Sequence, residues 1–160
     1  MHLKGREGNE LGLTPVGYQF PDNKTDPWDS NQLRVAVRVA TRQGTWEVSD
    51  PCLTTWEAKA LANWLMRRTA MGALSNSSFT APNMTIRARA ILNGRGFLTI
   101  GRFNVSVELE LEHRPPWATP AQGSRLHVEL DVEGKDLLQS SKDLREELSR
   151  YPQRGDDPTL

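Results

Sequence analysis

The chain has 160 residues, of which 37% are hydrophobic and 25% are charged, and its 20 Lys and Arg balance its 20 Asp and Glu. Because the net charge is zero, general nucleic-acid binding, which needs a positive excess, is disfavoured. The sequence has no membrane-spanning apolar stretch, no apolar signal-peptide core and a single cysteine, which excludes an internal disulfide. We expect one domain over residues 1–151, a disordered tail over residues 152–160 and a cytoplasmic location.

Two strands are predicted in the first half of the chain. Apolar and polar residues alternate over residues 33–39, which is the pattern of a half-buried strand. Gly44 then allows a turn into a second strand over residues 45–49. Both segments offer one apolar face to a core.

A complete helix-start signal follows these strands in the run from Asp50 to Glu57, DPCLTTWE. Pro51 lacks a backbone donor and is expected to stop the strand pairing. Thr54 is placed as the N-cap residue and Glu57 as its reciprocal partner, which together make a capping box. The helix is expected to end near Arg68.

A polar segment and a hairpin are predicted next. Residues 72–82 are rich in Ser, Asn and Gly, which indicates a loop. Residues 84–90 and residues 97–111 alternate as strands, and Asn93-Gly94 between them is a strong two-residue turn signal. The two strands are therefore expected to pair.

A two-residue turn would also fix the register of this hairpin. It pairs Ala90 with Phe97 and Met84 with Phe103, so that apolar side chains meet on one face of the sheet. Gly101 within the second strand is expected to mark a bend or a bulge, because a glycine weakens a regular strand.

The C-terminal part predicts one more strand and one more helix. Residues 126–132 alternate, and residues 136–151 place apolar residues at three- and four-residue spacing. Strands, a helix, strands and a helix, in that order, predict an α+β fold. We expect an antiparallel β-sheet of about six strands packed on one face by two α-helices.

The outer face of the predicted sheet is polarised. Residues 84–102 contain arginines and no acid, whereas residues 105–133 are rich in acids. The arginines are Arg87, Arg89, Arg95 and Arg102, and the acids are Glu108, Glu110, Glu112, Glu129, Asp131 and Glu133. One interpretation is a solvated face with Arg–Glu pairs that contribute ~0–1 kcal/mol each. The other is an acidic docking surface for a basic protein such as a nuclease domain.

The register of the last two strands bears on this choice. If they pair as neighbours, Glu110 is expected near His127 and Glu108 near Glu129. Like charges opposite each other are unfavourable, so such a pair would need a cation or a basic partner.

Candidate catalytic and metal-binding residues are few. Cys52 precedes a helix N-terminus, where the helix dipole favours a thiolate, and His113 or His127 is a conceivable partner. A buried structural cysteine is the commoner outcome for such a residue. The histidines lack metal-ligand spacing. Turns and helix caps explain the acids Asp22, Asp26 and Asp29 better than a calcium loop does.

Three segments, taken in order, resemble the signatures of a known family. Residues 17–21, GYQFP, with residues 28–31, WDSN, form the first signature. Residues 50–57, DPCLTTWE, form the second, and residues 114–117, RPPW, form the third. Together they are similar to the WapI family of immunity proteins over nearly the whole chain. Gln32 departs from the pattern, which has an aromatic residue after the WDSN segment.

The resemblance implies a bacterial protein that protects against contact-dependent toxins of the Wap type. Such a protein binds the toxic C-terminal domain, often a nuclease, and blocks it without catalysis. We therefore expect a non-enzymatic immunity protein whose partner is a cognate toxin domain, with no cofactor, metal, nucleic-acid or membrane partner. The predicted binding residues are Glu108, Glu110, Glu112, Glu129 and Asp131, with Asp26, Trp28 and Asp29 as a second patch.

Two alternatives from other classes stay open on the residues alone. One is an enzyme or a small-ligand-binding protein with a site around Cys52. The other is a structural or regulatory module with an unrelated partner. The aromatic residues of the turns, Trp117 of the RPPW segment among them, are expected to close the end of the core, although exposed aromatics would also make good interface anchors.

Overall fold

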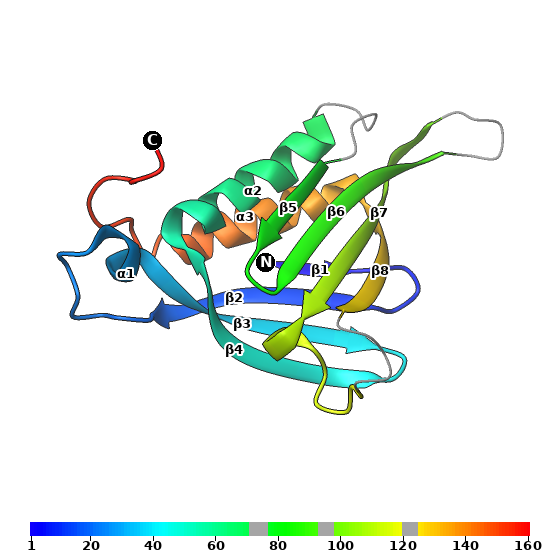
Figure 1. Cartoon of the computed structure of the whole chain (residues 1–160). Coiled ribbons are helices and arrows are strands. Elements are labelled where there is room, and N and C mark those ends of the chain that lie inside the picture. The colour runs from blue at the N-terminus through cyan, green and yellow to red at the C-terminus, as the bar shows by residue number, and fades with distance from the viewer. Residues whose placement is uncertain (71–76, 93–97, 120–124) are drawn as a thin grey trace.

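Alternating strands build two antiparallel sheets in the computed structural model, which describes residues 1–70, 77–92, 98–119 and 125–160 (Figure 1). The first sheet has the order β1 (His2–Lys4), β2 (Glu10–Tyr18), β3 (Gln32–Thr41) and β4 (Gly44–Thr54). The second has the order β5 (Ser77–Ala81), β6 (Met84–Leu92), β7 (Leu98–Glu110) and β8 (Arg125–Glu133). The helices are α1 (Pro27–Asn31), α2 (Thr55–Ala70) and α3 (Gly134–Leu148), with a 3₁₀ turn η1 (Leu111–His113).

The α+β class is confirmed, but the expected single sheet of about six strands with two helices differs in detail from the observed two sheets of four strands and three helices. The strand signals in the sequence are weak for β1, β2 and β5. Strand β1 has only three residues, and β2 contains Pro15 and two glycines, with a register shift between Pro15 and Gly17. Residues 77–81, predicted as loop, form β5, while residues 71–76 lie outside the described residues.

The turn between β1 and β2 joins the two sheets. The backbone N–H of Arg6 donates to the carbonyl of Asp131 at 2.9 Å. The side-chain amide of Asn9 donates to the carbonyl of Glu129 at 2.9 Å. Both acceptors belong to β8, so the turn supplies hydrogen-bond donors to backbone carbonyls on the free edge of that strand.

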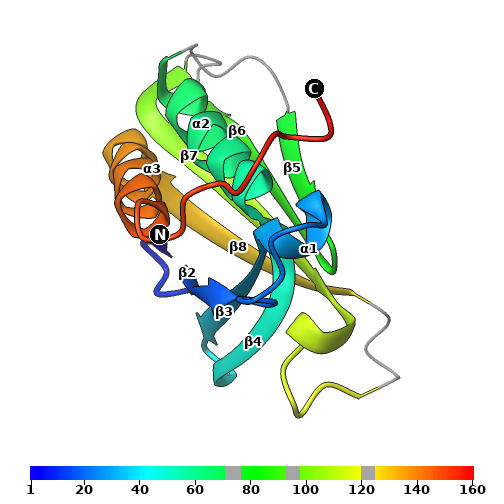
Figure 2. The same ribbon diagram turned by 90° about the vertical axis from the view of Figure 1, so that its left-hand side faces the viewer.

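The inner faces of both sheets and the two long helices share one core. Figures 1 and 2 show α2 and α3 lying side by side, and α3 packs on β1, β2, β7 and β8. Leu61 and Leu65 of α2 and Leu137 and Leu144 of α3 are fully buried. Burying each such leucine stabilises the fold by about 1.5–3 kcal/mol. The charged side chains are left on the outer faces.

Helix α2 begins at the predicted capping box. The Thr54 hydroxyl accepts from the backbone N–H of Glu57 at 3.3 Å, and the Glu57 carboxylate accepts from the N–H of Thr54 at 2.7 Å. The expected strand stop at Pro51 is wrong, because β4 continues to Thr54. Pro51 pairs opposite Arg34 beside a bulge, where the ladder is already interrupted and the missing donor costs little.

The β6–β7 hairpin forms, but the predicted register is wrong. Met84 lies opposite Leu109 instead of Phe103, and Ala90 lies opposite Phe103 instead of Phe97. The shift is an even number of residues, so the apolar face still points to the core. The proposed turn at residues 93–94 lies outside the described residues.

A bulge near Gly101 supplies part of the difference in register. Gly101 has φ +77°, a conformation that glycine adopts without strain, and the pairing slips between Ala90 and Leu92. The prediction of a bend at Gly101 is therefore confirmed. Its effect is that β7 uses more residues than β6 over the same length of sheet.

Candidate partner-binding face

The outer face of β6, β7 and β8 carries the predicted acidic residues except Glu112, which lies in η1, because alternation turns every second side chain away from the core. Outward residues are Thr85, Arg87 and Arg89 on β6, Asn104, Ser106, Glu108 and Glu110 on β7, and Arg125, His127, Glu129 and Asp131 on β8. The face is therefore of mixed charge, with arginines from β6 and acids mainly from β7 and β8.

The predicted register of β7 against β8 is also wrong. Glu108 lies opposite His127, and Glu110 lies opposite Arg125. Glu129 lies opposite Ser106, so the unfavourable Glu108–Glu129 pair does not form. The two-residue difference replaces a like-charge contact with opposite-charge contacts, which is the arrangement that cross-strand energetics favours.

Glu108 is the centre of an ion-pair cluster. Its carboxylate accepts from Arg87 and lies 3.8 Å from both Arg125 and His127. Only 13% of the side chain is exposed. The hydrogen bond from Arg87 lowers the pKa of Glu108 despite partial burial, and the charges of Arg87, His127 and Arg125 add to that effect. Glu110 is paired as well, at 2.6 Å from Arg125.

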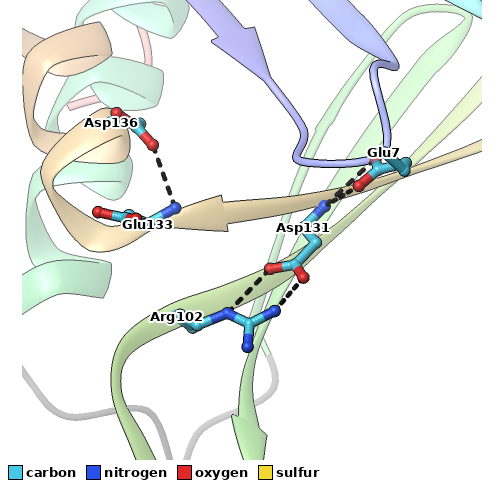
Figure 3. Close-up of polar contacts among 5 residues, drawn as sticks. All are labelled: Glu7, Arg102, Asp131, Glu133 and Asp136. Carbon is cyan, nitrogen blue, oxygen red and sulfur yellow. Dashed lines mark hydrogen bonds and ion pairs between the residues drawn. The ribbon is translucent and has the colours of Figure 1, made fainter.

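Asp131 is held on both its side chain and its backbone (Figure 3). Arg102 forms an ion pair with the carboxylate, and the carboxylate of Glu7 accepts from the Asp131 N–H at 3.2 Å. At the C-terminal end of β8, the Asp136 carboxylate accepts from the N–H of Glu133. This hydrogen bond is part of the capping box that starts α3 (Figure 3). Asp131 thus supports the junction of β8 with β7 and with the β1–β2 turn.

Glu112 and Glu129 differ in their surroundings. Glu112 lies in η1, where its carboxylate accepts from the side chain of Asn83 at 2.8 Å. The carboxylate of Glu129 is exposed and has no hydrogen-bond or ion-pair partner among the described residues. It lines an open hollow of about 440 Å³ on the outer face, together with Ser78, Arg87, Ala88, Arg89, Asn104 and Ser106.

The second predicted patch surrounds α1. Asp26 is the N-cap residue of this helix and accepts from the N–H groups of Trp28 and Asp29, each at 2.9 Å. Asp29 accepts from Asn23 at 3.3 Å. The Trp28 ring is 48% exposed and makes an edge contact with Trp56 at 5.3 Å between centroids. Both acids therefore have local structural roles, and the free face of Trp28 is the accessible group of this patch.

Cys52 is fully buried beneath the start of α2. Burial raises the pKa of its thiol to about 12, and the charges of Asp50 and Glu57 act in the same direction. The thiol is therefore protonated at neutral pH and inaccessible, which removes the nucleophile that a Cys-based site would need.

The two family segments around residues 50 and 114 meet at a buried contact. His113 is fully buried, and its Nε2 lies 3.1 Å from the carboxylate of Asp50. Its carbonyl accepts from the Trp46 indole at 2.9 Å, and Trp117 packs edge-on against Trp46. Trp117 thus covers Trp46 at one end of the core but is itself 41% exposed, so the core-closing role and the alternative of an interface anchor both stay open.

The described part of the chain has no cluster of three or more His, Cys, Asp or Glu side chains arranged to hold a metal ion. No helix in the same residues is long and apolar enough to cross a membrane. The outer face of β6–β8 and the surface around α1 present accessible charged and polar groups. An exposed sheet face of mixed charge is a surface that a protein partner of complementary charge can recognise.

The particular family follows from comparison with family models. The immunity protein WapI-like family matches residues 2–152, and the chain belongs to this family. An immunity role is thereby supported, and it implies a toxin as partner in general terms. A search of curated proteins finds no match to the chain.

The sequence does not mark the neutral residues of the hollow, because Asn104 and Ser106 are small polar side chains on a strand that alternation already explains. The charge pattern marks Arg89 only as one arginine of the sheet face. The signal that locates them is register: Asn104 lies opposite both Arg89 and Asp131, and Ser106 opposite Glu129. Alternation alone shows that these side chains point outward, but only the strand pairing brings them together.

Proposed function

We propose that this protein is a non-enzymatic, cytoplasmic immunity protein that binds and neutralises a cognate bacterial toxin domain, such as a nuclease, through the outer face of β6–β8. Family membership is the observation that carries the proposal. The proposed contact residues are Glu108, Glu110, Glu112, Glu129 and Asp131, with Asp26, Trp28 and Asp29 as a second patch around α1.

The charge pattern supports this choice of face. Acids concentrate on β7 and β8, and complementary charge across an interface raises the association rate and selects the partner. The ion pairs around Glu108 and Asp131 fix these side chains in place, which reduces the entropy lost on binding. Glu110, Glu112 and Glu129 are the more accessible members of the set.

Co-expression in a bacterial host tests the proposal. The toxin to be tested is the C-terminal domain of a large secreted protein, sought among the genes that neighbour this one. The wild-type protein should restore growth when that domain is induced, and the two purified domains should form a complex. Continued growth arrest together with no complex would contradict the proposed function.

Charge reversal tests the acidic part of the proposal. Glu110→Lys with Glu112→Lys changes two acids that are more exposed than Glu108. It removes the pair of Glu110 with Arg125 but keeps the pair of Glu108 with Arg87, so thermal unfolding must verify that the variant is folded. We expect a slower association rate and weaker protection, because each reversal turns attraction for a basic partner into repulsion. Glu47→Lys, an exposed acid on β4 of the other sheet, is the matched control and should protect like the wild type. Equal protection by both proteins would argue against an acidic docking surface.

Glu108 itself is a poor choice for such a test. Replacing it with Lys would leave Arg87, Arg125 and His127 around a fourth cation. The resulting loss of protection would reflect a weakened sheet as much as a lost contact. The competing proposal of a site around Cys52 has no accessible nucleophile to support it.

A further inference from the structure

The middle of the outer face of the second sheet separates its charges by strand. There, β6 presents Arg87 and Arg89, and β8 presents Glu129 and Asp131. Between them, β7 presents two neutral residues: Ser106 lies between Arg87 and Glu129, and Asn104 lies between Arg89 and Asp131. In this part of the face, two cations and two anions are thus held apart by a neutral pair.

Two of these four charges are compensated within the protein and two are not. Arg87 pairs with Glu108, and Asp131 pairs with Arg102. Neither Arg89 nor Glu129 has a side-chain hydrogen bond or an ion pair among the described residues, and both are exposed. Both line the same hollow.

The separation of the two free charges follows from the sheet geometry. Arg89 and Glu129 are two strands apart and offset by two residues along the strands. This places their Cα atoms about 10–12 Å apart. The polar side chains of Ser78, Asn104 and Ser106 line the hollow beside them, and none of these makes a side-chain hydrogen bond to a described residue.

We infer that this hollow is a dipolar docking subsite for the toxin domain, which presents a carboxylate side chain to Arg89 and a Lys or Arg side chain to Glu129. The inference rests on the proposed function and sharpens it. The partner surface is then of mixed charge at this point, and not uniformly basic.

Charge complementarity selects a polypeptide segment as the occupant. The Cα atoms of Arg89 and Glu129 are about 10–12 Å apart, a span that a polypeptide segment with an acidic and a basic side chain can bridge. A phosphate-rich ligand would be attracted by Arg89 but repelled by the unpaired Glu129 of the same hollow. A protein segment carries acidic and basic side chains at this spacing, and its backbone groups can use the hydroxyl and amide groups of Ser106 and Asn104.

Arg89→Glu separates the inference from a simple acidic surface. If the partner were uniformly basic, this change would add an acid to the face and leave binding unchanged or tighter. A dipolar subsite predicts that Arg89→Glu and Glu129→Arg each weaken binding by about 10- to 100-fold, because each change places like charges in contact. The measurement is the dissociation constant for the purified toxin domain that the wild-type protein neutralises in the co-expression test.

The matched controls lie on the outer face of the other sheet. Arg38 on β3 lies opposite Glu47 on β4, both are exposed, and neither lines the hollow. Arg38→Glu and Glu47→Arg should each change the dissociation constant by less than about 3-fold, because exposed charges outside the interface contribute little. Arg89→Gln and Glu129→Gln remove the charges without reversal and give intermediate losses. Thermal unfolding verifies that every variant is folded.

Suppressor selection identifies the partner groups directly. Arg89→Glu should be rescued by toxin changes from Asp or Glu to Lys or Arg, and Glu129→Arg by changes of the opposite sign. Normal binding by folded Arg89→Glu and Glu129→Arg, with wild-type protection intact, overturns the subsite and leaves the proposed function standing. A wild-type protein that neither binds nor protects overturns both.

Discussion

At the scale of single residues, Cys52 shows how burial decides chemistry. The thiol has the position before a helix that favours a thiolate, yet desolvation raises its pKa to about 12. The helix dipole contributes less than the cost of burying a charge in an apolar core. The position of Cys52 before a helix predicts a lowered thiol pKa, whereas its burial predicts a raised one. The effect of burial is the larger of the two.

The first prediction concerns this residue. Cys52→Ala should leave toxin neutralisation at the wild-type level, because the thiol contacts no partner, while unfolding becomes easier by about 1 kcal/mol through lost packing. Native protein should also fail to react with a thiol reagent at about pH 8, where a thiol of ordinary pKa reacts readily. Loss of neutralisation by a folded Cys52→Ala protein would instead support the enzyme interpretation.

At the scale of elements, strand identity was easier to predict than strand pairing. Alternation located β3, β6, β7 and β8, since buried faces leave a regular apolar pattern. It could not set the register of β7, because shifts by an even number of residues keep the same face inward. The hairpin signal at Asn93-Gly94 suggested the wrong even shift against β6. The pairing of β7 with β8 differs from the expected one by two residues, so Glu108 lies opposite His127 and not Glu129.

A pH prediction belongs to the pairing of β6, β7 and β8 through Glu108. Arg87 holds the pKa of Glu108 below its ordinary value of 4.5 in the folded state. The ionised carboxylate therefore stabilises the fold fully above about pH 4.5, and that contribution is lost as pH falls through the lower folded-state pKa. Wild-type protein should lose stability more steeply than Glu108→Gln between about pH 5 and about pH 3.

Chemical denaturation across this pH range provides the measurement. Glu47→Gln is the control, because Glu47 is exposed on β4 and has no ion-pair partner in the described residues. Its slope of unfolding free energy against pH should match that of the wild type. Parallel curves for Glu108→Gln and wild type would mean that the ion-pair cluster does not stabilise the sheet.

At the scale of the whole molecule, residues 28–31 of α1, one of the segments that resemble the family, contact the C-terminal segment of the chain. Asn31 is fully buried, and its amide donates to the Arg154 carbonyl at 2.7 Å while its oxygen accepts from the Arg154 N–H at 2.8 Å. The guanidinium of Arg154 lies 3.6 Å from the centre of the Tyr18 ring, and the Tyr18 hydroxyl donates to the Pro152 carbonyl. Figure 2 shows this C-terminal segment passing beside α1 and α2. These contacts join residues 18 and 31 to residues 152–154, which lie far apart in the sequence, so no local sequence pattern could predict them.

Whether residues 152–160 are disordered in solution stays a prediction, and truncation tests it. A disordered tail predicts no change when the chain ends after Tyr151. The contacts instead predict a loss of about 2–4 kcal/mol, because the buried amide of Asn31 loses both of its bonds to Arg154. Truncation after Gly155 retains those bonds and should cost less than about 0.5 kcal/mol, as for other exposed changes.

A mutant cycle separates this contact from a general effect of shortening the chain. In an Asn31→Ala background the buried amide is already gone, so truncation after Tyr151 should cost clearly less than it does in the wild type. Equal costs in the two backgrounds would show that Asn31 and Arg154 are not coupled. The outer sheet face lies on other elements, so toxin binding through that face should persist in every variant that stays folded. The second proposed patch shares α1 with Asn31, so a loss of binding confined to the Asn31→Ala and truncated proteins would report on that patch.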